Sequence, residues 1–313
     1  LTLADVQQFY QNYYAPNISH LVVVSDAPQA SITPKLGFLN SWATKPVTLP
    51  KATASTKADK TKLYFVNKDN APQSEIRIGY VGLPYDATGE YYRAYLMNYI
   101  LGGAFNSRIN LNLREDKGYT YGARSGFQGG RYAGPYTAQA GVRADASAAS
   151  VKEFMKEIES FRKDGITDEE LTFLKASIGQ SDALKYETGQ QKAMFLSRLV
   201  EYDLPTDYVK QQTEILNSLT AADVKNLANK YLPAEQMYIV TVGDKKYLPE
   251  LKQLGYEVIE LDADGNPVAA VEAAPAPAPA AESVTATSDK KMKVKTKEDG
   301  KKDKKKSKSD ESK

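Results

Sequence analysis

The sequence predicts an α+β domain in which a mainly antiparallel sheet is covered by helices on one face. Two short segments rich in β-branched and aromatic residues open the region after residue 60, and two helical segments follow them. Two further strand segments then precede a long run of helical segments. The first of these, residues 147–164, repeats apolar side chains at helical spacing and so has one continuous apolar stripe. Pairs of strands followed by blocks of helices are typical of this fold class.

The individual elements follow from local sequence patterns. The strands of the main domain are predicted at 62–67, 75–81, 119–127, 136–142, 236–242 and 256–261. Its helices are predicted at 90–101, 107–117, 147–164, 167–188, 189–201, 206–216 and 220–231, with a short helix after Lys245. Before the main domain we expect a helix over 1–14 that Thr2 caps, a strand over 20–24 and a helix over 27–43.

The first 26 residues are repeated near the other end of the chain. Residues 1–26 align without gaps to residues 219–244, and 9 of the 26 positions are identical, including Leu-Thr at the start and Asp at the end. This separation is far longer than the period of a solenoid repeat, but it suits a duplicated domain. We therefore expect residues 1–26 to be the last helix and strand of a preceding homologous domain that lies upstream.

Composition divides the rest of the chain into three parts. Residues 27–60 are predicted to be a helix and a linker, because 44–60 are rich in Thr, Lys, Ala and Pro and lack periodicity. Residues 61–268 are predicted to be the main domain. Residues 269–313 begin with alternating Ala and Pro and end in a segment, 289–313, with 12 lysines against 6 acidic residues. This composition predicts a disordered tail.

The sequence lacks the residues and motifs that several classes of function require. Cysteine is absent and His20 is the only histidine, so neither a metal site nor a hydrolase triad is expected within this chain. No P-loop occurs. The folded part lacks the surplus of basic residues that a nucleic-acid-binding protein needs. No apolar segment approaches the roughly 20 residues that cross a bilayer, so no transmembrane segment is expected.

The segment 102–122 is the strongest candidate for a functional site, because it predicts a helix, a glycine turn and a strand in close succession. Gly118 suits the left-handed position that commonly ends a helix. Arg114 then lies near the helix end and Tyr121 lies early in the strand. A guanidinium and a phenol placed in this way can donate hydrogen bonds to one carbonyl oxygen or oxyanion. The alternative is a surface arginine beside a tyrosine that is packed in the sheet.

The neighbouring residues Tyr119, Asn106 and Ser107 also allow more than one interpretation. Tyr119 is expected on the same strand face as Tyr121, where it is either a packing neighbour or part of the site. Asn106 or Ser107 is expected to cap the helix over 107–117.

At these residues the sequence resembles the pitrilysin/insulinase-type zinc metallopeptidases, and in particular the branch of the bacterial and mitochondrial processing peptidases. The matching residues are Leu101-Gly102-Gly103, Phe105, Ser107-Arg108-Ile109, Leu113 to Gly118, and Tyr121. The resemblance implies a clamshell of four homologous α+β domains. One half of the clamshell holds zinc with a His-x-x-Glu-His motif, and the other half supplies an Arg/Tyr pair that holds the substrate. It therefore implies catalytic roles for Arg114 and Tyr121, and it makes Tyr119, Phe105 and Asn106 candidate substrate-binding residues.

The sequence departs from this family at the metal site, because no His-x-x-Glu-His motif occurs in it. The resemblance then implies that no cofactor binds to this chain and that zinc is held by a complementary domain or subunit. We expect part of a zinc metalloendopeptidase that acts on peptides or unfolded polypeptides and is inactive on its own. The alternative is a non-catalytic scaffold or peptide-binding subunit of the same family. A periplasmic location is favoured by analogy with exported bacterial relatives.

Overall fold

Six strands form one mixed sheet in the computed structural model, which describes residues 1–51 and 57–268, except for the side chains of 181–184. The strands are β1 (Lys62–Asn67), β2 (Gln73–Val81), β3 (Thr120–Phe127), β4 (Pro135–Arg143), β5 (Tyr238–Gly243) and β6 (Glu257–Leu261). Their order is β3-β4-β2-β5-β1-β6, so β3 and β6 are the edge strands. The pairs β3–β4, β4–β2 and β2–β5 are antiparallel, whereas β1 is parallel to β5 and β6. The predicted α+β class is confirmed, with a parallel pairing at one end of the sheet.

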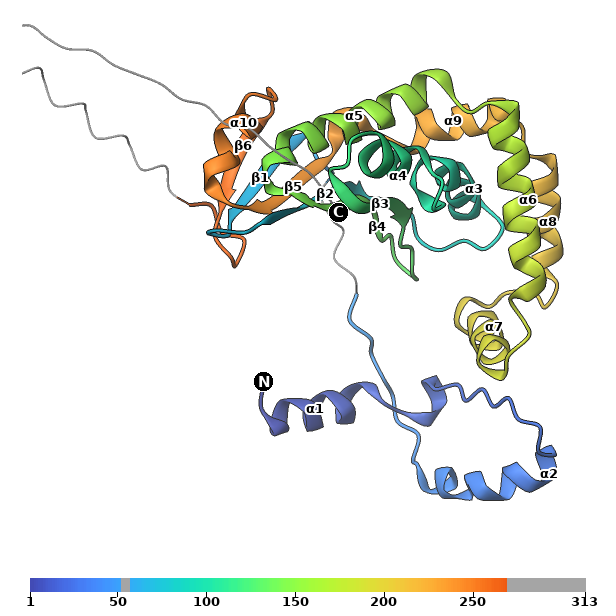
Figure 1. Ribbon diagram of the computed structural model, residues 1–313. Coiled ribbons are helices and arrows are strands. Elements are labelled where there is room, and N and C mark those ends of the chain that lie inside the picture. Colours follow the sequence, from blue (N-terminus) through green and yellow to red (C-terminus); the bar gives the residue numbers. More distant parts are fainter. Residues whose placement is uncertain (52–56, 269–313) are drawn as a thin grey trace, which may run out of the picture. The chain divides into compact units, whose positions relative to one another are not determined.

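One face of the sheet carries the hydrophobic core, because buried and accessible residues alternate along its strands. Leu63 and Phe65 of β1 are buried, as are Ile76 and Ile78 of β2, and the residues between them are accessible. The helices α3 (Glu90–Asn98), α5 (Ser147–Asp164) and α9 (Ala221–Tyr231) contribute to the same core. Figure 1 shows α3 and α5 along one side of the sheet. The predicted covering of one face by helices is therefore confirmed.

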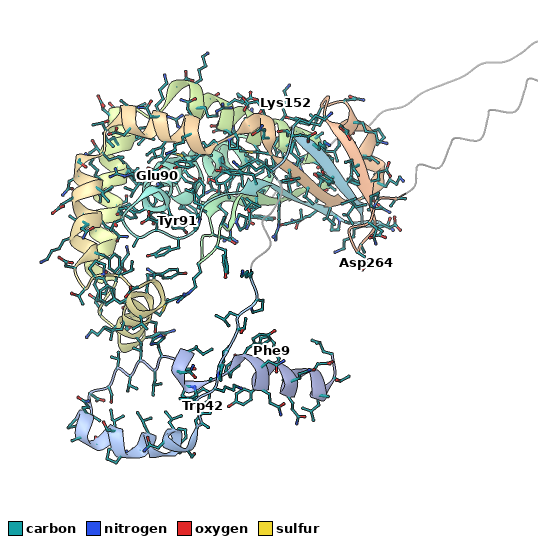
Figure 2. The ribbon with its side chains drawn as sticks, turned by 180° about the vertical axis from the view of Figure 1, so that it is seen from behind. Phe9, Trp42, Glu90, Tyr91, Lys152 and Asp264 are labelled. Carbon is teal, nitrogen blue, oxygen red and sulfur yellow. The ribbon has the colours of Figure 1, made fainter. Side chains whose placement is uncertain are left out.

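Four further helices belong to this domain. They are α6 (Asp168–Leu184), α7 (Gly189–Tyr202), α8 (Tyr208–Ser218) and α10 (Leu248–Lys252), and each corresponds to a predicted helix. The start of α3 is tied to the end of α9, because the Glu90 carboxylate accepts hydrogen bonds from Lys230 and Tyr231 (Figure 2). These bonds hold the pKa of Glu90 below its usual range. No helix in the described ranges is both long and apolar enough to cross a membrane.

Residues 1–51 form one regular helix, which is followed by short α-helical and 3₁₀ segments and irregular chain. The helix α1 (Leu3–Tyr13) has the predicted capping box between Thr2 and Asp5. The predicted helix over 27–43 is wrong for most of its length, because α2 covers only Gln29–Ile32 and a 3₁₀ segment continues to Ser41. Pro34 has no amide hydrogen to donate, which disfavours continued α-helical bonding.

The predicted strand over 20–24 does not form in this structure. A strand is stable only when its backbone groups pair with those of a neighbour. The repeated segment near the other end of the chain has this pairing, because β5 lies between β1 and β2. Among the described residues, 20–24 have no such neighbours, which explains why a strand-like sequence lacks strand structure here.

The two copies of the repeat also differ in burial. Both α1 and α9 have 11 residues and a capping box of the same kind. Val224 and Ala228 of α9 are fully buried, whereas the equivalent residues of α1, Val6 and Tyr10, are 58% and 52% exposed. The apolar face of α1 therefore lacks the packing that its equivalent has.

The predicted linker, residues 44–60, contains both irregular and packed residues. Residues 44–51 have no helix or strand, and 52–56 lie outside the described ranges. Ala58 is buried, and Lys60 forms an ion pair with Glu257 of β6 at an Nζ–Oε2 distance of 2.9 Å. Residues 57–60 thus pack onto the main domain. The predicted tail, 269–313, lies outside the described residues.

Candidate functional site

The predicted helix over 107–117 combines two helix types and ends in a glycine turn. A short α-helical segment, α4 (Arg108–Asn110), continues into a π-helical segment, Leu111–Asp116. π-Helical segments are rare and occur frequently at functional sites. Gly118 adopts the predicted left-handed conformation, with a φ of +63°. Because a residue with a Cβ atom is strained in this conformation, glycine allows the chain to turn at once into β3.

Arg114 lies in the last turn of this helix and rests against Phe105. The guanidinium carbon is 4.7 Å from the centroid of the Phe105 ring, and Nε is 3.5 Å from the Glu115 carboxylate. The side chain of Arg114 is 34% exposed, and Phe105 is 70% exposed. An arginine stacked on an aromatic ring still presents hydrogen-bond donors at the edge of its guanidinium plane. The structure thus brings two predicted site residues, Arg114 and Phe105, into contact.

Tyr121 is presented by an irregularity in the edge strand β3. The register between β3 and β4 shifts between Thr120 and Ala123, as it does at a β-bulge. The Thr120 hydroxyl holds this bulge, because it accepts from the Gly122 amide at 3.1 Å and donates to the Gly141 carbonyl at 2.7 Å. The side chain of Tyr121 is 91% exposed. The alternative reading, a tyrosine packed in the sheet, is therefore wrong.

Asn110 joins the helix to the strand and fixes the geometry of this corner. Its amide nitrogen donates to the Phe105 carbonyl at 2.7 Å, and its oxygen accepts from the Ala123 amide at 2.9 Å. Asn110 is only 4% exposed. Because both ends of a buried amide are satisfied by backbone groups, the Phe105 turn and the start of β3 are held in one arrangement.

Two further side chains cap the outer edge of β3. The Asn98 amide donates to the Ser125 carbonyl at 2.8 Å, and the Tyr91 hydroxyl donates to the Phe127 carbonyl at 2.9 Å (Figure 2). An edge strand ordinarily offers such backbone groups to an incoming strand. Together with the Asn110 bond, these side chains occupy that edge from residue 123 to residue 127.

The other two predicted substrate-binding residues make different contacts. Tyr119 precedes β3 and is half-buried, and its carbonyl accepts from the Arg143 amide at 2.9 Å. Tyr119 and Tyr121 therefore differ in exposure, because Tyr121 is 91% exposed. Asn106 is exposed, and Ser107 occupies the N-cap position of α4 without a side-chain capping bond.

A groove of about 510 Å³ adjoins this corner. The residues that line it are Glu75, Gly103, Ala104, Phe105, Asn110, Gly122, Ala123, Arg124, Gln139, Ala140 and Gly141. Phe105 contacts Arg114, and Gly122 follows Tyr121 in the chain. The groove is therefore lined by a neighbour of each candidate catalytic residue, although neither Arg114 nor Tyr121 is among its lining residues.

Sequence reasoning missed two residues of this site, Asn110 and Arg124. Asn110 lies next to Ile109 in a predicted helix, and a polar residue beside buried apolar ones is a signal for a specific hydrogen bond. Arg124 stands among small residues of a predicted strand, which is the only local signal for it. Neither signal identifies the partner, because the contacts of Arg124 and the Ala123 contact of Asn110 come from other elements of the fold.

The described residues do not fit a zinc ion. No group of three His, Cys, Asp or Glu side chains lies close enough together in 1–51 and 57–268 to hold a metal. The single histidine, His20, is exposed. A zinc site needs such a cluster of nitrogen, sulfur or carboxylate ligands.

Two solved structures described as peptidase proteins share this arrangement of sheet and helices. A peptidase M16 inactive domain from Pseudomonas fluorescens has a TM-score of 0.68 and 25% sequence identity, and the match covers 78% of this chain and 58% of that one. A protease from Helicobacter pylori has a TM-score of 0.69 and 20% identity, over 77% of this chain and 59% of that one. The fold is thus that of a peptidase domain.

The chain belongs to the peptidase M16 inactive domain family, whose profile matches residues 1–178, more than half of its length. The uncharacterized zinc protease YmxG of Bacillus subtilis is 25% identical over 223 residues, which are 71% of this chain and 53% of that protein. An uncharacterized zinc protease of Rickettsia felis is 27% identical over 168 residues, 53% of this chain and 40% of that protein. The chain spans about half the length of these curated relatives. The family predicted from the residues around Arg114 is confirmed.

Proposed function

We propose that this chain supplies the substrate-binding part of a zinc metalloendopeptidase that hydrolyses peptides or unfolded polypeptides. In this proposal Arg114 and Tyr121 contact the substrate, and a complementary domain or subunit holds the zinc. Membership of the peptidase M16 inactive domain family supports the proposal, and so do the relatives named as zinc proteases. A periplasmic location stays a prediction by analogy.

The observation that carries the proposal is the presentation of Arg114 and Tyr121 from two rigid elements across one glycine turn. Arg114 is braced by the Phe105 ring at 4.7 Å, and the bulge of β3 leaves Tyr121 91% exposed. Donors that are already oriented stabilise the negative charge that develops on a reacting carbonyl oxygen. A guanidinium and a phenol are both donors at neutral pH, so neither has to change its protonation state in order to act.

The chemistry of peptide bond cleavage lies outside this chain in the proposal. Zinc in a complementary domain would supply an activated water molecule. The described residues of this chain do not form a metal-ligand cluster, so its own part is to bind the peptide, to orient the carbonyl group and to donate hydrogen bonds to its oxygen. Phe105 and the groove beside it offer the peptide an apolar contact next to these donors.

Residues 1–26, in the same proposal, complete a preceding domain with the fold of the main domain. The exposed Val6 and Tyr10 of α1 support this assignment, because their equivalents in α9 are buried. The unpaired segment 20–24 supports it as well, because its equivalent β5 pairs with strands on both sides. Both features are expected of elements whose packing partners belong to another part of the protein.

The test measures peptide hydrolysis by the assembly of this chain with its zinc-bearing domain. Removal of one oxyanion donor typically lowers kcat by about 10²–10³, so Arg114→Ala and Tyr121→Phe are each expected to cause such a loss with unchanged thermal unfolding. Lys152→Ala, on the accessible surface of α5 (Figure 2), and Tyr132→Phe, in the β3–β4 loop, are matched controls. Wild-type turnover in both site variants would refute the proposed roles.

The second candidate function is that of a non-catalytic scaffold or peptide-binding subunit. The description of the family as an inactive domain favours this alternative. It predicts that Arg114→Ala weakens peptide binding to this chain while turnover by the assembly stays unchanged. Parallel measurements of binding and turnover on the same variant therefore separate the two candidates.

A further inference from the structure

We propose that Arg124 binds a carboxylate of the peptide, so that the groove beside β3 selects peptides that carry an acidic group there. This inference rests on the proposed function, because it takes the groove beside Phe105 to be a peptide-binding site. It goes further by naming the class of peptide and the residue that recognises it.

The first argument is that the side chain bonded to Arg124 is neutral. Arg124 is exposed and lies opposite Gln139 in the register of β3 and β4. With the Gln139 amide turned so that its oxygen faces the arginine, this oxygen accepts from Nε and Nη2, both at 2.9 Å. Gln139 is neutral, so it orients the guanidinium without cancelling its charge. Arg124 takes part in none of the ion pairs found among the described residues, unlike Arg77, Arg108 and Arg143.

The second argument is the balance of charge around the groove. Glu75 is the acidic member of the lining, and its carboxylate already pairs with Arg77 at an Nε–Oε1 distance of 3.6 Å. Arg77, Glu75 and Arg124 together therefore leave one positive charge. Arg114 lies at the Phe105 end of the groove, where Glu115 at 3.5 Å offsets its charge. The positive charge that remains is located at Arg124 and attracts an anionic group.

The third argument is that side chains already occupy part of the outer edge of β3, which disfavours strand addition over residues 123–127. Asn110, Asn98 and Tyr91 bond to three of its outward backbone groups, the Ala123 amide and the Ser125 and Phe127 carbonyls. A peptide in the groove is then distinguished by its side chains and charged groups more than by its backbone. Gln139 uses two of the five donors of Arg124, which leaves three for a ligand. A planar guanidinium fork fits a carboxylate better than it fits a neutral amide.

The carboxylate has two sources in a peptide, the side chain of Asp or Glu and the free C-terminus. Both present the same pair of oxygens to Arg124, and the experiment separates them. Short labelled peptides are made with Glu or Gln at one internal position, and each is made with a free and with an amidated C-terminus. Their binding to the 313-residue chain is measured by fluorescence anisotropy, and the corresponding kcat/KM values are measured with the assembly.

We expect a carboxylate-bearing peptide to bind about 10-fold more tightly than its neutral counterpart. A preference that follows Glu over Gln identifies the side chain as the source, and one that follows the free over the amidated end identifies the C-terminus. Arg124→Gln is expected to abolish the preference. Gln139→Glu is expected to abolish it too, because it places a carboxylate of the protein against Arg124. Arg131→Gln, an exposed arginine of the β3–β4 loop, is the matched control and keeps the preference.

Three results would overturn the inference. These are equal affinities for all peptides, a preference that persists in Arg124→Gln, and no measurable binding up to about 1 mM peptide. The variants are compared after circular dichroism and thermal unfolding have established that they are folded. Failure here is distinct from failure of the proposed function, because Arg124 is tested by peptide preference whereas Arg114 and Tyr121 are tested by turnover.

Discussion

Asn110→Ala tests whether one buried amide sets the geometry of the candidate site. The substitution deletes the bond to the Phe105 carbonyl at 2.7 Å and the bond from the Ala123 amide at 2.9 Å, at a residue that is 4% exposed. A typical hydrogen bond contributes about 0.5–1.5 kcal/mol, and a buried group left without a partner costs about 1–3 kcal/mol. For the two bonds together we expect the free energy of unfolding to fall by about 2–4 kcal/mol.

The assays are urea unfolding of the 313-residue chain and hydrogen exchange of the Ala123 amide. In Asn110→Ala this amide is expected to exchange faster than in the wild type, because its acceptor is gone. Asn110→Asp separates the two bonds, since it keeps an acceptor for Ala123 but loses the donor to Phe105. The control is Asn106→Ala, at an exposed neighbour, with an expected change within about 0.5 kcal/mol. A similarly small change for Asn110→Ala, with unaltered exchange at Ala123, would contradict the reasoning.

Two other predictions concern stability. Glu170 accepts two hydrogen bonds from Arg108, at 2.7 and 2.6 Å. Partial burial raises the pKa of the Glu170 carboxyl group, but the bonds from Arg108 lower it, and the net pKa lies below its usual range. Because the folded-state pKa is lowered, the ionised carboxylate stabilises the fold above the unfolded-state pKa, and this stability is lost as pH falls through the folded-state pKa. Glu170→Gln should therefore lower the free energy of unfolding by about 1–2 kcal/mol near pH 7 and by progressively less below about pH 4. Val224→Ala should lower the free energy of unfolding of this chain, measured in urea, by about 1–3 kcal/mol, because Val224 is fully buried. Val6 is the equivalent residue of the first copy but is 58% exposed, so Val6→Ala should destabilise only a longer protein that contains the preceding domain. A loss of stability in Glu170→Gln that does not change with pH would contradict the first prediction. Equal losses of stability in Val224→Ala and Val6→Ala in this chain would contradict the second.

Features encoded by neighbouring residues were predictable from the sequence. The turn at Gly118 follows from the need for a residue without a Cβ atom at positive φ. The apolar stripe of α5 follows from helical periodicity, and its residues form part of the core. Thr2 and Asp5 form the expected capping box. The residues around Arg114 were also sufficient to predict the family, because its characteristic segment is continuous in the sequence.

Only the tertiary structure shows which residues far apart in the chain are in contact. The parallel pairing of β1 with β5 joins Lys62 to Tyr238, and no local pattern specifies that neighbour. The exposure of Tyr121 depends on a bulge that exists only against β4. The partner of Arg124 is Gln139 of β4, and Asn110 acts through Ala123 of β3. Local sequence indicates most of the helices, turns and strands, although residues 20–24 form no strand where no neighbour among the described residues pairs with them. The order of strands in the sheet determines which side chains meet, because pairing brings together segments that share no sequence signal.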